Sequence, residues 1–103
     1  IKDIDIKKFA AVSNDYNPVH LDDDYALKSR FKKRIAHGLI SGSFFSALFG
    51  TKIPVPGSVY VQQTFNFKKS VYLGDTVIAT VTSIDKIKRR VFLKQLVRLR
   101  VKL

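Results

Sequence analysis

An uncharged segment from Gly38 to Phe49 constrains the fold of this chain more than any other feature. If the segment is helical, its apolar side chains leave almost no polar face: Leu39, Ile40, Phe44, Phe45, Ala47, Leu48 and Phe49. A helix that is apolar nearly all round is buried, so we expect a central buried helix over about residues 38–50. The longer uncharged run over 35–51 is too short to span a membrane, and it contains three serines and three glycines.

Alternating patterns in the second half of the chain predict strands that can cover this helix. Apolar and polar residues alternate over 59–67 and again over 90–103. Between these segments, a Gly74-Asp75 turn precedes a stretch over 75–85 that is rich in Val, Ile and Thr. We therefore expect an antiparallel sheet wrapped around the central helix, which is an α+β architecture.

The first third of the chain predicts helices. A mostly apolar stripe at helical spacing indicates a helix over 3–14, formed by Ile6, Phe9, Ala10 and Ser13. Asp22 is the expected N-cap of a short second helix. With 103 residues, the chain is expected to form one domain over 1–103.

Between these two helices lies the run D-x-N-P-V-H, with Asp15, Asn17, Pro18 and His20 at its fixed positions. Pro18 has no N–H and keeps Asn17 out of the α region, so the first helix must stop and the chain must turn. This turn can bring Asp15 and His20 together as an acid/base pair, while the Asn17 amide fixes the loop. Alternatively, the run is ordinary turn chemistry and His20 is a satisfied loop histidine.

Composition restricts the classes of function. There is no cysteine, and His20 and His37 alone are too few for a convincing metal cluster, so we expect no metal. The net charge of +11 indicates an anionic partner, either a phosphate-bearing cofactor, an acidic carrier protein or nucleic acid; alternatively, it is a solvated basic surface. Because there is no methionine, even at position 1, we expect a processed chain or a trimmed piece of a longer protein.

Four blocks of the sequence resemble, in order and spacing, the signature of the MaoC-like (R)-specific enoyl-thioester hydratases. They are D-x-N-P-V-H-x5-A over 15–26, IAHGL over 35–39, LFGTKIPVPG over 48–57 and VYLGD over 71–75. The resemblance implies a hot-dog fold and a homodimer with its active site near the subunit interface. Family members usually have a further strand before the first helix and another after the last strand, and we expect this chain to lack both. Asn14 stands where many members carry Gly.

The resemblance implies a hydro-lyase that hydrates trans-2-enoyl thioesters reversibly to (R)-3-hydroxyacyl thioesters in fatty acid metabolism. It is either an enoyl-CoA hydratase or a 3-hydroxyacyl-carrier-protein dehydratase. By the family pattern, Asp15 and His20 hold the water and share the proton transfers, in an order left open. Gly38 maps to the oxyanion hole, at a helix start where N–H groups lack partners. Coenzyme A or phosphopantetheine enters as part of the substrate, so no separate cofactor is expected.

Other residues have expected supporting roles. Asn17 is a positioning residue for the loop, Ser46 lines the pocket, and His37 begins the central helix rather than taking part in catalysis. A basic cluster is expected to bind the phosphates of coenzyme A or an acidic carrier protein, or else to be a solvated loop: Arg30, Lys32, Lys33 and Arg34.

Two other classes of function are open. A non-catalytic acyl-binding hot-dog module is the first, and the presence of both Asp15 and His20 argues against it. A basic nucleic-acid-binding domain is the second, suggested by the charge and by the basic residues over 90–102. Aromatic residues do not interleave with that basic face as a stacking platform requires. The expected location is a bacterial cytoplasm or a mitochondrial matrix rather than outside the cell, because the chain has no cysteine.

Overall fold

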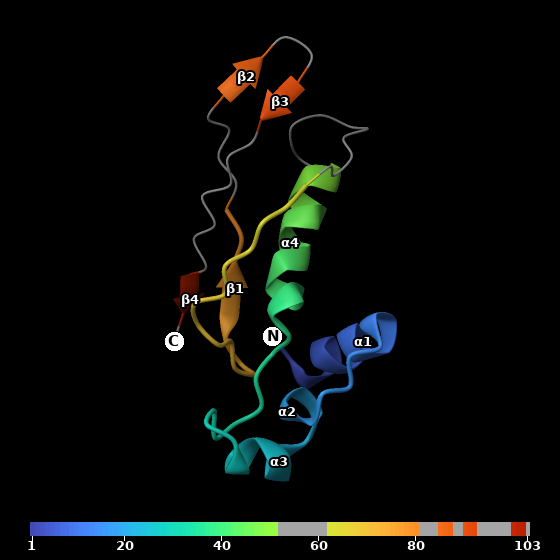
Figure 1. The fold of residues 1–103 in the computed structure, drawn as a ribbon, viewed down its shortest axis with the longest axis vertical. Helices are drawn as coiled ribbons and strands as arrows, with labels where there is room; N and C mark the ends of the chain where they lie inside the picture. The colour runs from blue at the N-terminus through green and yellow to red at the C-terminus, as the bar shows by residue number, and fades with distance from the viewer. Residues whose placement is uncertain (52–61, 81–84, 88–89, 93–99, 103) are drawn as a thin grey trace.

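The computed structural model describes residues 1–51, 62–80, 85–87, 90–92 and 100–102. The first half contains the helices α1 (Asp3–Ser13), α2 (Pro18–Leu21), α3 (Asp23–Lys28) and α4 (Gly38–Thr51). The second half contains the short strands β1 (Thr76–Ile78), β2 (Asp85–Ile87), β3 (Arg90–Phe92) and β4 (Arg100–Lys102). The three short helices gather at the N-terminal end of α4 (Figure 1). Within the described parts of the chain, no helix is long and apolar enough to cross a membrane.

Helix α1 matches its prediction to within one residue at its C-terminal end. The Lys2 N–H at its start donates to Asp5 Oδ2 at 2.7 Å, which satisfies one of the free donors of the first turn. At the other end, Asn14 has φ 61°, in the left-handed region that Gly and Asn adopt most readily. The backbone at position 14 therefore has a conformation that both Gly and Asn tolerate.

The chain then forms two more helices, of which one was predicted. Asp22 is the N-cap of α3, where its Oδ1 accepts the Tyr25 N–H at 2.8 Å. The single turn α2 was not predicted, although its start has the usual signals: Asn17 Oδ1 accepts the Val19 N–H at 3.1 Å and Pro18 occupies the first helical position. The residues that end α1 thus also begin the next helix.

Helix α4 begins at Gly38 as predicted and extends to Thr51. Its inner face is buried, and Ile40 belongs to the core cluster with Ile6, Ala36 and Val71. Its other face is open in the single chain, where Leu39 is 54% exposed and Ser43 and Ser46 are also exposed. The expected burial is thus found on one side of the helix.

The segment over 62–67 lies alongside α4 (Figure 1) and forms no strand pairing, whereas a strand was predicted over 59–67. Residues 59–61 lie outside the described parts. The predicted strand is therefore wrong for residues 62–67, because alternation alone does not fix a backbone partner. A Cβ at Gly42 would lie 2.9 Å from Phe65 Cζ, and one at Gly38 would lie 3.1 Å from Phe67 Cε1. Both glycines let an aromatic ring rest against the helix.

The described strands form two antiparallel pairs. Strand β1 pairs with β4, with Val77 opposite Val101, and β2 pairs with β3. The predicted turn before β1 is confirmed, because Gly74 has φ 91° and the Asp75 N–H donates to the Tyr72 carbonyl at 3.1 Å. Of the single long strand predicted over 90–103, the structure describes β3 and β4, which belong to different pairs, and residues 93–99 and 103 lie outside the description.

Candidate active site

Asp15 lies in the turn between α1 and α2, held by its own neighbours. Its N–H donates to Ser13 Oγ at 3.2 Å, and its Oδ1 accepts the Asn17 N–H at 3.1 Å. The Asp15 side chain is 50% exposed, so its carboxylate can be reached by a ligand. Asn17, in turn, holds the first turn of α2, which is consistent with its predicted role as a positioning residue.

His20 lies at the other end of the motif, in α2, and is buried. Its Nδ1 lies 2.7 Å from the Ile35 carbonyl oxygen, which can only accept, so Nδ1 carries the proton and the Nε2 lone pair is free. Burial lowers the pKa of His20, and the neighbouring His37 lowers it further. The Ile35 carbonyl and the Asp15 carboxylate act in the opposite direction. The balance favours a neutral imidazole that can accept a proton.

His37, the residue before α4, completes the cluster. It is 3% exposed, and its Nε2–H donates to the backbone carbonyl of Asp15 at 3.0 Å. Its ring lies against the His20 ring, with centroids 3.9 Å apart and planes 31° apart. From the sequence, His37 was predicted to begin the central helix, and its place in this cluster was not predicted. A signal was nevertheless present, since His37 adjoins Gly38 and consecutive Cα atoms are about 3.8 Å apart.

The three side chains are close enough to act on one small molecule. A carboxylate oxygen of Asp15 and one ring nitrogen each of His20 and His37 lie within 4.8 Å of one another. Two hydrogen bonds of about 2.8 Å to a tetrahedral water oxygen span about 4.6 Å. A single water can therefore contact both Asp15 and His20.

The same three groups are also the candidates for holding a metal ion. However, the His37 nitrogen that lies 3.9 Å from Asp15 Oδ2 already donates to the Asp15 carbonyl. A cation bound to this nitrogen would have to displace that hydrogen bond. The geometry therefore suits acid/base chemistry better than metal binding, and the predicted lack of a metal stays a prediction.

Gly38 begins α4 directly after His37, so its N–H lies beside the cluster. As the first helical residue it has no intrahelical acceptor for this group. The glycine also has a packing reason, because the Phe67 ring occupies the space that a Cβ would need. The position is compatible with an oxyanion-hole donor, and the packing alone could also require glycine.

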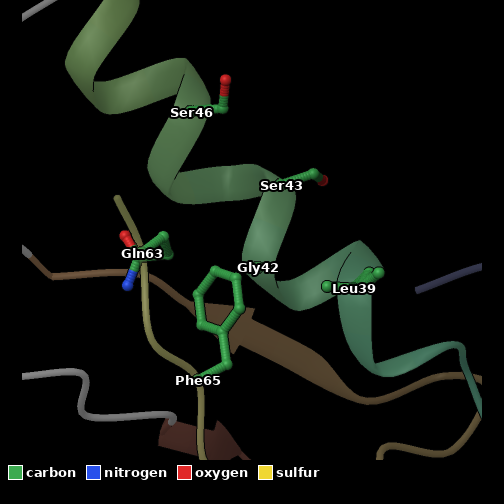
Figure 2. Close-up of a pocket in the computed structure, with 6 residues that line it drawn as sticks. All are labelled: Leu39, Gly42, Ser43, Ser46, Gln63 and Phe65. Atoms are coloured by element: carbon green, nitrogen blue, oxygen red, sulfur yellow. The ribbon is translucent and has the colours of Figure 1, made fainter. Parts of the chain in front are cut away.

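A groove of about 290 Å³ runs along the open face of α4 (Figure 2). Its lining is Leu39, Gly42, Ser43, Ser46, Gln63 and Phe65. Ser46 lines this groove, whereas its expected place in a pocket near Asp15 stays a prediction, because no described contact joins the two residues. Since Leu39 follows Gly38, one end of the groove lies next to the candidate oxyanion position.

The basic cluster does not behave as one unit. Arg34 has a side chain that is only 10% exposed; its Nη2 lies 2.6 Å from Asp3 Oδ1 and its Nε donates to the His20 carbonyl at 2.7 Å. The Lys7 ammonium lowers the pKa of Asp3, and the Arg34 guanidinium lowers it further. Arg34 thus links α1 to α2 through Asp3 and the His20 carbonyl. The other three residues of the cluster are exposed: Arg30, Lys32 and Lys33.

Comparisons with known proteins place these observations in a family. The family model described as "MaoC like domain" matches residues 1–103. An (R)-specific enoyl-CoA hydratase of Rhodospirillum rubrum is 52% identical over 82 residues, covering 80% of this chain and 57% of the relative. A mitochondrial 3-hydroxyacyl-[acyl-carrier-protein] dehydratase of Arabidopsis thaliana is 40% identical over 80 residues, covering 78% of this chain and 47% of the relative.

Solved structures agree with the expected fold. The unliganded R-hydratase of Pseudomonas aeruginosa aligns with a TM-score of 0.79 and 46% identity, covering 84% of this chain and 56% of that one. The prediction of a hot-dog fold is confirmed by this likeness together with the family match. The chain spans about half the length of the curated relatives it matches.

Proposed function

Because the chain belongs to the MaoC-like domain family, we propose that the protein adds water reversibly to trans-2-enoyl thioesters, giving (R)-3-hydroxyacyl thioesters. One observation carries the proposal: the Asp15 carboxylate and a His20 ring nitrogen lie within 4.8 Å, a separation that one water can bridge. One relative is named for the hydration and another for the reverse dehydration, and each aligns with most of this chain. This similarity supports the same chemistry here.

In the hydration direction, the water loses one proton to the Asp15–His20 pair while its oxygen bonds to C3 of the enoyl thioester. The electron pair of the C2–C3 double bond moves toward the thioester, whose oxygen gains negative charge. A proton from the pair is then delivered to C2, so the atoms of one water are added. The free Nε2 lone pair of His20 suits the first step, and the half-exposed Asp15 is open to the substrate.

The Gly38 N–H is the proposed donor to the thioester oxygen. The N-terminus of α4 favours the charge that develops there. From this point the acyl chain can follow the groove past Leu39 toward Ser46, where a mixed apolar and polar lining is available.

The exposed basic residues Arg30, Lys32 and Lys33 are the proposed contacts for phosphates of coenzyme A or for an acidic carrier protein. Relatives named for coenzyme A substrates and for carrier-protein substrates are both similar to this chain, so we propose the thioester class without choosing the carrier. A homodimer that covers the open face of α4 is part of the proposal, as is a bacterial cytoplasmic or mitochondrial location.

The test is hydration of crotonyl-CoA, followed by the loss of the enoyl-thioester absorbance, with analysis of the product's configuration. We expect turnover to (R)-3-hydroxybutyryl-CoA, and a crotonyl-carrier-protein substrate run in parallel identifies the preferred carrier. A folded protein that turns over neither thioester, or that forms the (S) product, would refute the proposal.

A further inference from the structure

His37 connects the two members of the acid/base pair. Its Nε2–H donates to the backbone carbonyl of Asp15, which lies 22 residues earlier in the chain. The centroid of its ring lies 3.9 Å from that of the His20 ring. We infer that His37 is a positioning residue that keeps the Asp15 carboxylate and the His20 imidazole at the separation that one water bridges. This inference rests on the proposed hydration, in which one water must contact both side chains.

The hydrogen bond from His37 has a function that local contacts of Asp15 cannot replace. The bonds of Asp15 with Ser13 and Asn17 each span two residues, so they fix the shape of the turn but not its distance from His20. Among the hydrogen bonds described for Asp15, the one from His37 is the link to a distant segment. Because the Asp15 side chain is half exposed, packing alone holds it weakly.

The environment of His37 also indicates that it is a fixed donor rather than a second base. Its Nε2 holds the proton that the Asp15 carbonyl accepts, and its Nδ1 is buried with no hydrogen-bond partner. A proton moved to Nδ1 would lack an acceptor, and the bond to Asp15 would be lost. Phe9 contacts the same ring, with centroids 4.9 Å apart, but makes no hydrogen bond to it.

Two substitutions of His37 and one control separate positioning from general stability. His37→Phe keeps a ring beside His20 but removes the donor, so kcat for crotonyl-CoA should fall about 10²-fold with little change in KM, as expected for a misplacement of about 1 Å. His37→Gln keeps an amide donor and should recover part of that loss. Phe9→Leu, the matched control, replaces one apolar contact of the His37 ring with another and keeps the hydrogen bond to Asp15, so it should lower Tm with kcat nearly unchanged.

Three results would overturn the inference: a parent-like kcat in His37→Phe, no recovery in His37→Gln, or equal losses of kcat in His37→Phe and Phe9→Leu. If the parent protein itself lacks turnover, the proposed function fails, and nitrogen-15 NMR still decides the structural part. The spectra should show the His37 proton on Nε2, and the amide signals over 15–17 should shift in His37→Phe but not in Phe9→Leu. A proton on Nδ1, or unshifted amides, would refute the positioning role.

Discussion

Replacing Gly38 with proline should lower kcat by about 10²–10³-fold, because it deletes one backbone N–H at the proposed oxyanion position. Gly38 is the first residue of α4, where an N–H has no intrahelical acceptor and where proline is well tolerated. The His37 carbonyl already accepts the Ile40 N–H at 3.1 Å, so the first turn of the helix does not need the deleted group. The expected loss corresponds to about 2.7–4 kcal/mol of transition-state stabilisation.

The steric cost of the substitution is set by Phe67. A Cβ at position 38 would lie 3.1, 3.2 and 3.3 Å from three atoms of this ring, against about 3.5–4.0 Å for an ordinary carbon contact. The Phe67 side chain must retreat by a few tenths of an ångström, and it is 54% exposed, so it can move outward. We therefore expect a destabilisation of about 1 kcal/mol, at the lower end of overpacking costs.

Gly38→Ala is the matched control, because it adds a Cβ and keeps the N–H. The assay is crotonyl-CoA turnover with Tm measured for each variant, and Gly38→Ala should lose less than about 10-fold in kcat if the N–H is what matters. In a Phe67→Leu background the alanine variant should approach the activity of that background, whereas the proline variant should not. Equal losses of kcat in the proline and alanine variants would refute the argument and leave Gly38 with a packing role only.

Three further predictions concern pH, the basic cluster and the groove. Because burial lowers the pKa of His20, the imidazole binds a proton more readily in the unfolded chain, so the free energy of unfolding should fall as pH drops below 6.5. His20→Gln should reduce this pH dependence in thermal unfolding measured at several pH values. The same dependence of Tm on pH in the variant and the parent protein would contradict the assignment. Arg34→Gln should lower Tm by about 4–8 °C, since it weakens the contacts of Arg34 with α1 and with the His20 carbonyl. Lys33→Gln, in the same loop, should leave Tm unchanged and raise KM for crotonyl-CoA at low salt; no change in KM would remove Lys33 from the phosphate site. Ser46→Phe should narrow the groove and raise KM for a long enoyl thioester about 10-fold more than for crotonyl-CoA, and equal effects on both substrates would argue against an acyl site there.

Local chemistry made the ends of the early helices predictable. Asp22 was expected to cap a helix and does so, because an N-cap is a contact across three residues. The Asn17-Pro18 pair was interpreted only as a helix stop, although the same two residues also start α2. In both cases the signal lies within one turn of the chain. Helix α2 was not predicted because Asn17 and Pro18 were interpreted as the end of one helix and not also as the start of the next.

Contacts between distant segments were not predictable in the same way. The bond from His37 to the Asp15 carbonyl spans 22 residues, and the bond from Arg34 to Asp3 spans 31. Neither leaves a periodic pattern, so His37 was interpreted as a helix start and Arg34 as one of four similar basic residues. Likewise, the alternation of Phe65 and Phe67 with polar residues does not indicate that their rings lie against two glycines of α4.

The most direct test of the Asp15–His20 pair is the rate of crotonyl-CoA hydration by the parent protein, Asp15→Asn and His20→Gln, with circular dichroism confirming that each is folded. Asp23→Asn, which changes an exposed carboxylate in the first turn of α3, is the matched control. We expect the first two variants to lose about 10²–10⁴-fold in kcat and the control to match the parent protein. A folded Asp15→Asn or His20→Gln variant with parent-like turnover would contradict the assignment of catalysis to this pair.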